Sequence, residues 1–433
     1  MEEIAARYAP QDMLRSGGGR VDGAERSRRF SLLHLDESED YVGDWQGTMR
    51  APTGSLDPYP AASAAADSNG KLRGRIRLLS GAVVFDPDDI VVPMLKFPLG
   101  SVRRLEALGG SADAFELVCA RTVAIRPGGR DVDYAVDPDA LRLGPWRFDL
   151  SHQPAGKVLE PMGRLIAIQQ MKSMADRQRA LETLRVARED SVVFNRRNLM
   201  DPETESVCFE ASAAAICPLV REPGRLAVTD QGVYFQPIHD VAGGCAARRV
   251  CLSGIGAVLR RRCSLRQVGL EVFFKAVNAS TSGDRARGDA GGTFLGPSAL
   301  FELRSEGERE ACVQALLGAL AATALRRGDG DDKAITGGAV AGSALLEGKI
   351  GWLEATTAAW RRGAVSNLDY LLYLNLASGR GFNDLTQWPV MPWILRDYTS
   401  TTLDLNDPGV YRDLARPVGA LDDERLATLR ERM

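Results

Sequence analysis

The sequence lacks most of the residue patterns on which enzyme chemistry is built. Its three histidines, at positions 34, 152 and 239, lie far apart, and none stands beside a cysteine or carboxylate pattern that suggests a metal. It contains no G-x-S-x-G nucleophile turn, no Walker A sequence and no complete G-x-G-x-x-G. We therefore predict no enzymatic activity, no cofactor and no bound metal.

Paired cysteines, a strong net charge and long apolar runs are missing as well. Seven cysteines are scattered without a C-x-x-C pair, which predicts reduced thiols in a cytosolic protein. A formal net charge of −3 gives no general case for nucleic acid as a partner. The longest apolar tract, residues 311–325, is interrupted by Gln314 and is too short to span a bilayer. No signal peptide is visible, so we expect a cytoplasmic protein without a transmembrane segment.

Two similar series of strand patterns, each followed by a helical pattern, occupy most of the chain. Residues 1–28 are polar and rich in glycine and arginine, which predicts disorder, and residues 48–70 read as a long loop. Strand patterns then run from 71 to 151, and a helical pattern begins near 157. A second strand series spans 210–305, and a helix with an apolar stripe is expected over 306–326.

The two series resemble one another in sequence. LLSGAVVFDPDD (78–89) is similar to VTDQGVYFQPIHD (228–240), and MLKFPLGSVRRL (94–105) is similar to RVCLSGIGAVLRR (249–261). Seven short strands closed by one amphipathic helix suit a pleckstrin-homology (PH)-like or GRAM-like barrel. We therefore predict an α+β protein with two tandem barrels at 29–195 and 205–327. A flexible linker at 328–345 and a mostly irregular and helical segment at 346–433 follow.

Residues 366–421 combine an apolar composition with sequence features that exclude regular structure. Ser366 is placed to cap a short helix, and Gly379 and Gly381 end it. Pro389 and Pro392 then exclude both a helix interior and a central strand. If this backbone is buried, polar side chains interleaved along it must supply its hydrogen bonds.

These residues carry a family resemblance. SNLDYLLYLN (366–375), GRGFNDLTQWPVMPWILRDY (379–398), LDLNDPGVYRDLARPVGAL (403–421) and DDERL (422–426) resemble the opening of the BEACH domain. Family members more often carry Tyr and Phe where Trp388 and Met391 stand. The blocks RFSLLHLDESEDY, RGRIRLLSGAVVFDPDD, PGRLAVTDQGVYFQPI and QVGLEVFF add a resemblance to the subfamily of the factor associated with neutral sphingomyelinase activation (FAN).

The resemblance implies a function and a set of important residues. It implies a scaffold or adaptor in membrane trafficking or receptor-proximal signalling, with residues 346–433 as the N-terminal part of a BEACH domain that packs against the second barrel. Family members continue into a longer BEACH domain and a WD-repeat propeller, so a fragment or a truncated form is expected. The resemblance assigns the motif residues of the BEACH segment, which are Asn367, Tyr370, Asn375, Arg380, Asn383, Asp384, Gln387, Trp388, Pro389, Pro392, Trp393, Asp397, Tyr398, Arg412, Asp413 and Pro417.

An arginine cluster leaves a second function open. Its members are Arg248, Arg249, Arg260, Arg261, Arg262 and Arg266. Basic residues near a membrane surface each attract anionic lipid by about 1 kcal/mol, so a phosphoinositide-binding module peripheral to endomembranes or the plasma membrane is the alternative function. A solvated face, or a docking face for residues 346–433, is nevertheless the favoured interpretation of the cluster. Protein partners in trafficking or signalling are expected, and nucleic acid is not.

Overall fold

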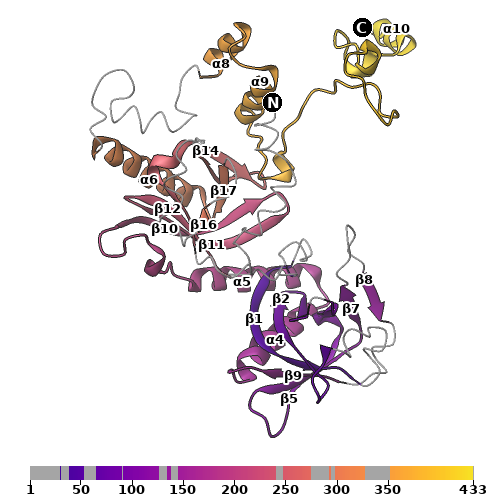
Figure 1. Ribbon diagram of the computed structural model, residues 1–433, viewed down its shortest axis with the longest axis vertical. Helices are drawn as coiled ribbons and strands as arrows, with labels where there is room; N and C mark the ends of the chain where they lie inside the picture. The colour runs from indigo at the N-terminus through magenta and orange to yellow at the C-terminus, as the bar shows by residue number, and fades with distance from the viewer. Residues whose placement is uncertain are drawn as a thin grey trace. The chain divides into compact units, whose positions relative to one another are not determined.

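The computed structural model describes residues 30, 39–52, 65–89, 91–125, 134–137, 145–239, 247–274, 292–293, 298–326 and 352–432. The chain divides into two compact units, Met1–Lys349 and Ile350–Met433. Figure 1 shows their elements, and each unit is described by itself. The expected disordered N-terminus at 1–28 and the expected linker at 328–345 lie outside the described residues.

Nine strands among the described residues form the first sheet, in the order β5-β6-β9-β1-β2-β3-β4-β7-β8. Each neighbouring pair is antiparallel. The strands are β1 (Tyr41–Arg50), β2 (Lys71–Leu79), β3 (Ala82–Pro87), β4 (Met94–Pro98), β5 (Val102–Ala107), β6 (Ala114–Cys119), β7 (Thr122–Ile125), β8 (Tyr134–Asp137) and β9 (Trp146–Leu150). Helices α4 (Gly156–Gln169) and α5 (Met174–Ser191) follow.

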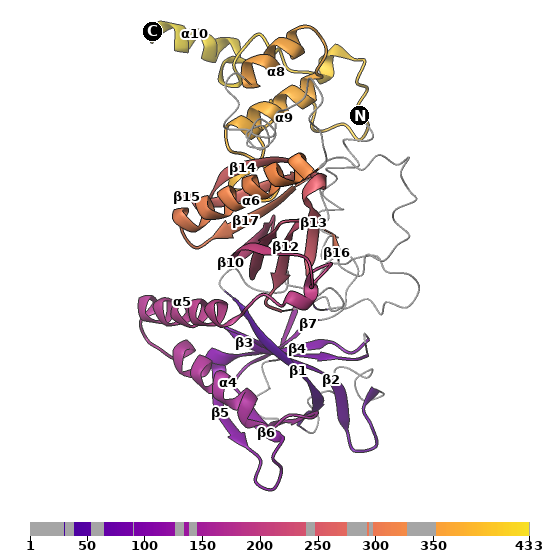
Figure 2. The same ribbon diagram turned by 90° about the vertical axis from the view of Figure 1, so that its left-hand side faces the viewer.

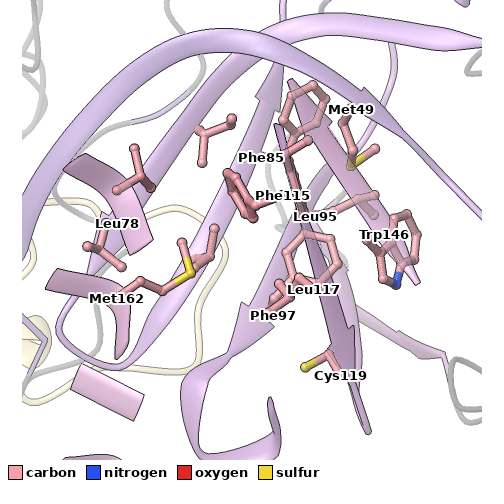
Figure 3. Close-up of a cluster of buried hydrophobic side chains, with 14 of the residues drawn as sticks. Met49, Leu78, Phe85, Leu95, Phe97, Phe115, Leu117, Cys119, Trp146 and Met162 are labelled. Carbon is pink, nitrogen blue, oxygen red and sulfur yellow. The ribbon is translucent and has the colours of Figure 1, made fainter. Parts of the chain in front are cut away.

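The core of the first sheet lies between its concave face and α4. Residues on β2 alternate between buried and exposed near its start, as expected for a sheet with one face on the core. Met162 of α4 is fully buried among the side chains of the strands (Figure 3). The Phe97 ring meets Trp146 edge-on at 5.1 Å, and Phe115 stacks on Phe148 at 5.0 Å. Aromatic packing of this kind adds about 0.5–1.5 kcal/mol per pair beyond area burial.

The second sheet contains eight described strands in the order β14-β15-β17-β10-β11-β12-β13-β16. The strands are β10 (Val207–Cys217), β11 (Val220–Thr229), β12 (Gly232–Pro237), β13 (Arg248–Cys251), β14 (Ile255–Cys263), β15 (Arg266–Phe274), β16 (Gly292–Thr293) and β17 (Ser298–Leu303). Helix α6 (Glu306–Arg326) lies against these strands (Figure 2) and buries Val313, Leu316 and Leu320. The predicted apolar stripe of this helix is therefore confirmed.

The two sheets share one strand order. The first sheet has the order β5-β6-β9-β1-β2-β3-β4, and the second has the order β14-β15-β17-β10-β11-β12-β13. Each strand of the first sheet therefore has an equivalent at the same position in the second. Short 3-10 turns precede β5 and β14 at Leu99–Ser101 and Leu252–Gly254. The predicted fold class, two PH-like barrels each closed by a C-terminal helix, is confirmed.

Three local expectations were wrong. Residues 48–50, placed in a loop, belong to β1, whose polar Asp44 and Gln46 hide its strand character. Within the strand patterns at 71–151, the run FELVCARTVAI (115–125) predicts a single strand, yet a turn separates β6 from β7. The helical pattern after 157 breaks between α4 and α5, where the Ser173 hydroxyl accepts a hydrogen bond from the backbone N–H of Asp176 and starts a new helix.

A glycine at the same place in both sheets allows a phenylalanine ring to cross the strand. Gly74 pairs with Pro87 and Gly224 pairs with Pro237. A Cβ on Gly74 would lie 2.9 Å from the ring of Phe85, and a Cβ on Gly224 would lie 2.5 Å from the ring of Phe235. Both glycines are therefore required for close approach.

We predict that Gly224→Ala lowers the free energy of unfolding by about 1–3 kcal/mol, because the new methyl group overpacks the site. Its Cβ would also lie 2.4 Å from the Gln236 carbonyl oxygen, which is backbone and cannot move aside cheaply. Gly318→Ala is the matched control, since a Cβ there meets nothing within 4 Å and lies within α6. This control should raise stability by up to about 1 kcal/mol. Urea unfolding of the whole chain measures both, and equal effects would contradict the prediction.

The second unit has little regular structure. Its helices are α8 (Trp352–Arg361), α9 (Asn367–Ala377) and α10 (Asp423–Glu431), joined by 3-10 turns at Leu385–Gln387, Pro408–Val410 and Val418–Ala420. Ser366 caps α9 by accepting from the backbone N–H of Asp369 at 3.1 Å, as predicted. Gly379 has a φ of +84°, which ends that helix.

Candidate interaction surfaces

Four arginines of the predicted cluster lie near the tight β14–β15 hairpin. Ser264 and Leu265 at its tip have φ values of +49° and +65°, which is unusual for residues other than glycine. Leu265 is 79% exposed. Arg261 is buried and its Nε lies 2.6 Å from Glu271 Oε2, while Arg260 Nη2 lies 2.6 Å from Glu310 Oε1 on α6. Paired carboxylates therefore balance part of this charge.

The exposed arginines of the hairpin differ in their partners. Arg266 Nη2 lies 2.7 Å from Glu302 Oε1 and its side chain remains 60% exposed. Arg262 Nε donates to the side-chain oxygen of Gln267 at 3.0 Å, with that amide oriented to accept. Arg262 and Arg266 thus keep the most accessible charge near the hairpin.

The remaining two cluster members stand on β13, at the opposite end of the strand order from β14. Arg248 forms an ion pair with Glu222 and lies over the ring of Phe235, 5.0 Å from its centroid. Arg249 pairs in register with Tyr234 of β12. The six arginines are close in sequence, but the sheet divides them into two groups.

The carboxylates that hold these arginines also tie α5 to the second sheet. Glu302, whose side chain is 9% exposed, receives Arg221 Nε at 2.8 Å as well as Arg266. Arg221 Nη1 lies 3.3 Å from Glu189 of α5, and the Glu189 backbone carbonyl accepts from the Ser212 hydroxyl at 3.1 Å. Sequence reasoning missed these glutamates, because their partners lie tens of residues away.

We predict that Arg261→Met and Arg266→Met differ sharply in stability. Removing Arg261 leaves the buried Glu271 carboxylate without its charged partner, which should cost about 3–5 kcal/mol. Removing Arg266 takes away one exposed guanidinium from a carboxylate that Arg221 still holds, so the loss should stay below about 1 kcal/mol. Thermal and urea unfolding measure both changes. Equal losses of unfolding free energy would show that the burial of an ion pair does not determine how much it stabilises the protein.

His239, which follows β12, contacts α5 and the first strand. It lies against Arg188, and the Arg188 guanidinium donates to the backbone carbonyls of Tyr41 and Val42. The Tyr41 and His239 ring centroids are 4.9 Å apart. Burial and the charge of Arg188 lower the pKa of His239 to about 3, and burial lowers the pKa of Arg188 to about 10. This histidine is therefore neutral in the folded protein, where it lies half-buried just after the end of β12.

We predict that His239 makes the folded protein less stable in mild acid. In the unfolded chain the imidazole binds a proton below a pH of about 6.5, whereas in the folded chain it stays neutral down to about pH 3. Proton binding therefore favours the unfolded state as pH falls through this window. His239→Asn should show a flatter dependence of unfolding free energy on pH between 6.5 and 4. Identical slopes for the wild type and His239→Asn would refute the prediction.

In the second unit, Asn375 joins α9 to the extended segment after it. Its side chain is buried, with Nδ2 donating to the Leu371 and Val390 carbonyls at 2.9 and 2.8 Å, and Oδ1 accepting from Val390 N–H at 2.7 Å. One amide thus satisfies both backbone groups of Val390, as a neighbouring strand would. The expectation that polar side chains supply hydrogen bonds to the irregular backbone holds at this residue.

Two arginine side chains also supply hydrogen bonds to the irregular backbone of this unit. Arg380 Nη1 donates to the Trp388 carbonyl at 3.0 Å, and the rings of Phe382 and Trp388 meet edge-on at 5.2 Å. Arg412 Nε donates to the Leu395 carbonyl at 2.7 Å while its guanidinium lies 5.4 Å from the ring centroid of Trp393. A backbone bridge between Leu395 and Tyr411 completes this crossing.

Other motif residues cap turns or stack. Asp397, Asp384 and Asp413 accept from backbone N–H groups two residues ahead, at 2.9, 2.8 and 3.0 Å. The Ser400 hydroxyl, together with the backbone N–H groups of Thr399 and Ser400, holds the pKa of Asp397 well below its usual range. Tyr370 stacks on Trp360 at 4.5 Å, and Asn367 accepts from the indole N–H of Trp360 at 2.8 Å.

The last motif residues act through their backbones or lie near the surface. The Gln387 carbonyl accepts from Gly381 N–H at 2.9 Å, and the Pro417 carbonyl accepts from Ala420 N–H at 2.8 Å. Pro389 and Pro392 flank the extended backbone around Val390, and Asn383 lies in the turn before Asp384. Tyr398 is 70% exposed.

Large apolar side chains of this unit face outward. Within its described residues, Trp393 is 64% exposed and Val390 is 59% exposed, while the buried apolar side chains are Val410 and Ala420. Soluble proteins rarely expose contiguous apolar patches beyond a few hundred square ångströms, and larger ones commonly mark interaction sites. Side-chain hydrogen bonds thus hold the backbone while the apolar groups remain available for contact.

We predict that Asn375→Leu unfolds the second unit locally. The substitution keeps a similar volume but removes the two hydrogen bonds that the amide makes to the backbone N–H and C=O of Val390, and the loss of each costs about 0.5–1.5 kcal/mol. Amide hydrogen exchange should rise at Val390, measured by mass spectrometry of the whole chain. Asn406→Leu is the control, since Asn406 is exposed and its side-chain bond is local to Asp404. Unchanged protection at Val390 in Asn375→Leu would refute this role.

The described residues show neither a group of His, Cys, Asp and Glu that could hold a metal ion nor a helix that could span a membrane. The described cysteines, at 119, 208, 217, 251, 263 and 312, form no disulfide with one another.

Comparisons with known proteins give two family matches. The Beige/BEACH domain model matches residues 358–433, which include the motif residues from Asn367 onward. The model of the FAN protein N-terminal PH domain matches residues 20–180, which contain the first sheet and α4. BEACH and PH domains are adaptor-type modules without catalytic activity.

Curated relatives cover parts of the chain. A putative neurobeachin homolog from Caenorhabditis elegans is 31% identical over 236 residues, which is 52% of this chain and 8% of the relative. The BEACH domain-containing protein lvsD of Dictyostelium discoideum is 51% identical over 76 residues, or 18% of this chain and 3% of the relative. The chain thus spans less than a tenth of the length of these relatives.

One solved structure, the DH/PH domains of p115-RhoGEF, aligns with 39% of this chain and 49% of its own length. Its sequence identity is 9% and its TM-score is 0.19, too low to add to the fold assignment.

Proposed function

We propose that this chain, which belongs to the BEACH-domain family and carries a FAN-type PH domain, is a non-catalytic scaffold in membrane trafficking or receptor-proximal signalling. The observation that carries the proposal is the second unit, where exposed Trp393, Val390 and Tyr398 are presented on a backbone held by Asn375 and Arg412. Rigid aromatic side chains of this kind dominate the energy of protein interfaces. Domain limits at 29–195, 205–327 and 346–433 form part of the proposal.

Proximity labelling tests the scaffold function. The whole chain, fused to a biotin ligase and expressed in cells, should label trafficking or receptor-associated proteins above the ligase alone. Trp393→Ser with Val390→Ser should reduce that labelling at least about fivefold, because truncating interface aromatics commonly costs more than 1 kcal/mol each. Leu414→Ser is the control, since Leu414 is 65% exposed outside this set. Labelling equal to the free ligase, or unchanged by the double variant, would contradict the proposal.

One observation supports binding of anionic lipid as a second function. Arg262 and Arg266 remain exposed beside Leu265 at the β14–β15 hairpin. Two charges near a membrane contribute about 1 kcal/mol each, so binding should be weak and without headgroup selectivity. The other cluster arginines are held by carboxylates or by the sheet, which makes this function secondary to the scaffold.

Sedimentation with phosphoinositide-doped liposomes tests the lipid function. Arg262→Glu with Arg266→Glu should abolish weak, salt-sensitive binding, and Lys157→Glu with Arg164→Glu, at two exposed positions of α4, provides a charge-matched control away from the hairpin. Selective submicromolar binding by the wild-type chain would instead place lipid recognition ahead of scaffolding.

An intramolecular contact between the second barrel and the BEACH segment also belongs to the proposal. The exposed apolar residues of the second unit are suited to such a contact. Fragments 346–433 and 205–433 can be compared by thermal melting and hydrogen exchange. Amides at Trp388–Tyr398 should be protected more strongly in the longer fragment, and a cooperative melt of the shorter fragment alone would argue against the contact.

A further inference from the structure

The first sheet has an open edge at β5. This strand is the outermost in its sheet and pairs only with β6. The backbone N–H of Leu108 donates to the Ala114 carbonyl at 2.9 Å, which sets the alternation of the ladder. The N–H and C=O groups of Leu105 and Ala107 therefore point away from β6. In the described part of the chain, no residue forms a hydrogen bond with these outward groups.

A side chain already occupies the next position along this edge. The amide of Gln170, at the end of α4, donates to the outward Val102 carbonyl at 3.0 Å. Helix α4 contacts β5, and Leu159 and Ile166 on the helix are half-buried against the same core as Leu105. The edge thus borders partly exposed apolar side chains, which can receive alternate residues of an added strand.

The equivalent edge of the second sheet carries a side-chain bridge to its helix. Its equivalent strand, β14, is bridged to α6 by the Arg260–Glu310 ion pair at 2.6 Å. No ion pair links β5 to α4 within the residues that the structure places. The two sheets therefore differ at this edge, where a further strand could add.

Charge on the outer face of β5 defines the complementary peptide. Arg103 lies at an irregularity in the ladder, is exposed, and has no ion-pair partner among the described residues. Arg104 forms long ion pairs with Glu116 at 3.7 Å and with the exposed Glu106 at 3.9 Å, and half of its own side chain remains exposed. A strand added here presents one set of alternate residues to these arginines and the other set to the apolar side chains.

We propose that the open edge of β5, with Leu159 and Ile166 of α4, binds an extended peptide of alternating apolar and acidic residues as an added antiparallel strand. Main-chain hydrogen bonds to Leu105 and Ala107 supply affinity, and the alternation supplies selectivity. The site goes beyond the proposed scaffold function, because peptide capture here requires neither the BEACH segment nor lipid.

The test uses the whole chain and a fluorescein-labelled peptide of four Glu-Val repeats, with binding followed by fluorescence anisotropy. The wild-type chain should bind it saturably. Ala107→Pro should weaken binding at least about tenfold, because it removes an outward N–H without touching the bonds to β6. Ala107→Ser, which keeps that N–H, should bind as the wild type does. Arg103→Glu with Arg104→Glu should weaken binding by a similar factor.

A second probe keeps the test decisive should Ala107→Pro fail to fold. The same peptide with alternate backbone amides N-methylated loses one row of hydrogen bonds, so the unaltered protein should bind it at least about tenfold more weakly. Three results would overturn the proposal: no saturable binding to the wild type, equal affinity for the N-methylated peptide, or loss of binding in Arg260→Ala but not in folded Ala107→Pro. The last result would place the peptide at β14.

Discussion

The concave face of a bent antiparallel sheet must be covered by other side chains. In the first unit, α4 covers this face of the first sheet and α6 covers it in the second. Met162 of α4 and Leu316 of α6 are fully buried against their strands. Burial of such side chains contributes about 1.5–3 kcal/mol each, which exceeds the contribution of an exposed ion pair such as Arg266–Glu302. The helices therefore set the stability of each sheet, and the outer faces and edges can differ between the copies.

The outer faces of the two sheets differ in their ion pairs. The second sheet pairs its arginines with glutamates such as Glu302, and this chain of charges continues to Glu189 on α5. Leu181 and Leu184 of the same helix pack against the core of the first sheet. Helix α5 therefore has an apolar side for one sheet and an ionic side for the other, although none of its residues is fully buried. Its attachment to the second sheet should be the more sensitive to salt.

The sequence was most informative where a pattern runs without interruption. GVYFQP predicts β12 and residues 306–326 predict α6 with the bounds that the structure has. Strand β1 could not be found this way, because its glycines and polar residues match a loop and its place is fixed by pairing with β2 and β9. In the second unit, family resemblance identified Asn375, but its bonds to Val390 depend on a turn between α9 and the proline stretch. The pairing of Arg260 with Glu310 likewise depends on the helix crossing the sheet.

Two sheets with one strand order in a single chain create an opportunity for strand exchange during folding. A small difference between β1 and β10 opposes it. Gly47 pairs with Gly74 in the first sheet, whereas Ala213 pairs with Gly224 in the second. A Cβ at position 47 would lie 2.4 Å from the Asp149 carbonyl oxygen. Strand β10 would bring the methyl group of Ala213 to that place, so it cannot substitute for β1 without moving β9 away. The absence of a methyl group at Gly47 thus favours the pairing of β9 with β1 over its pairing with β10.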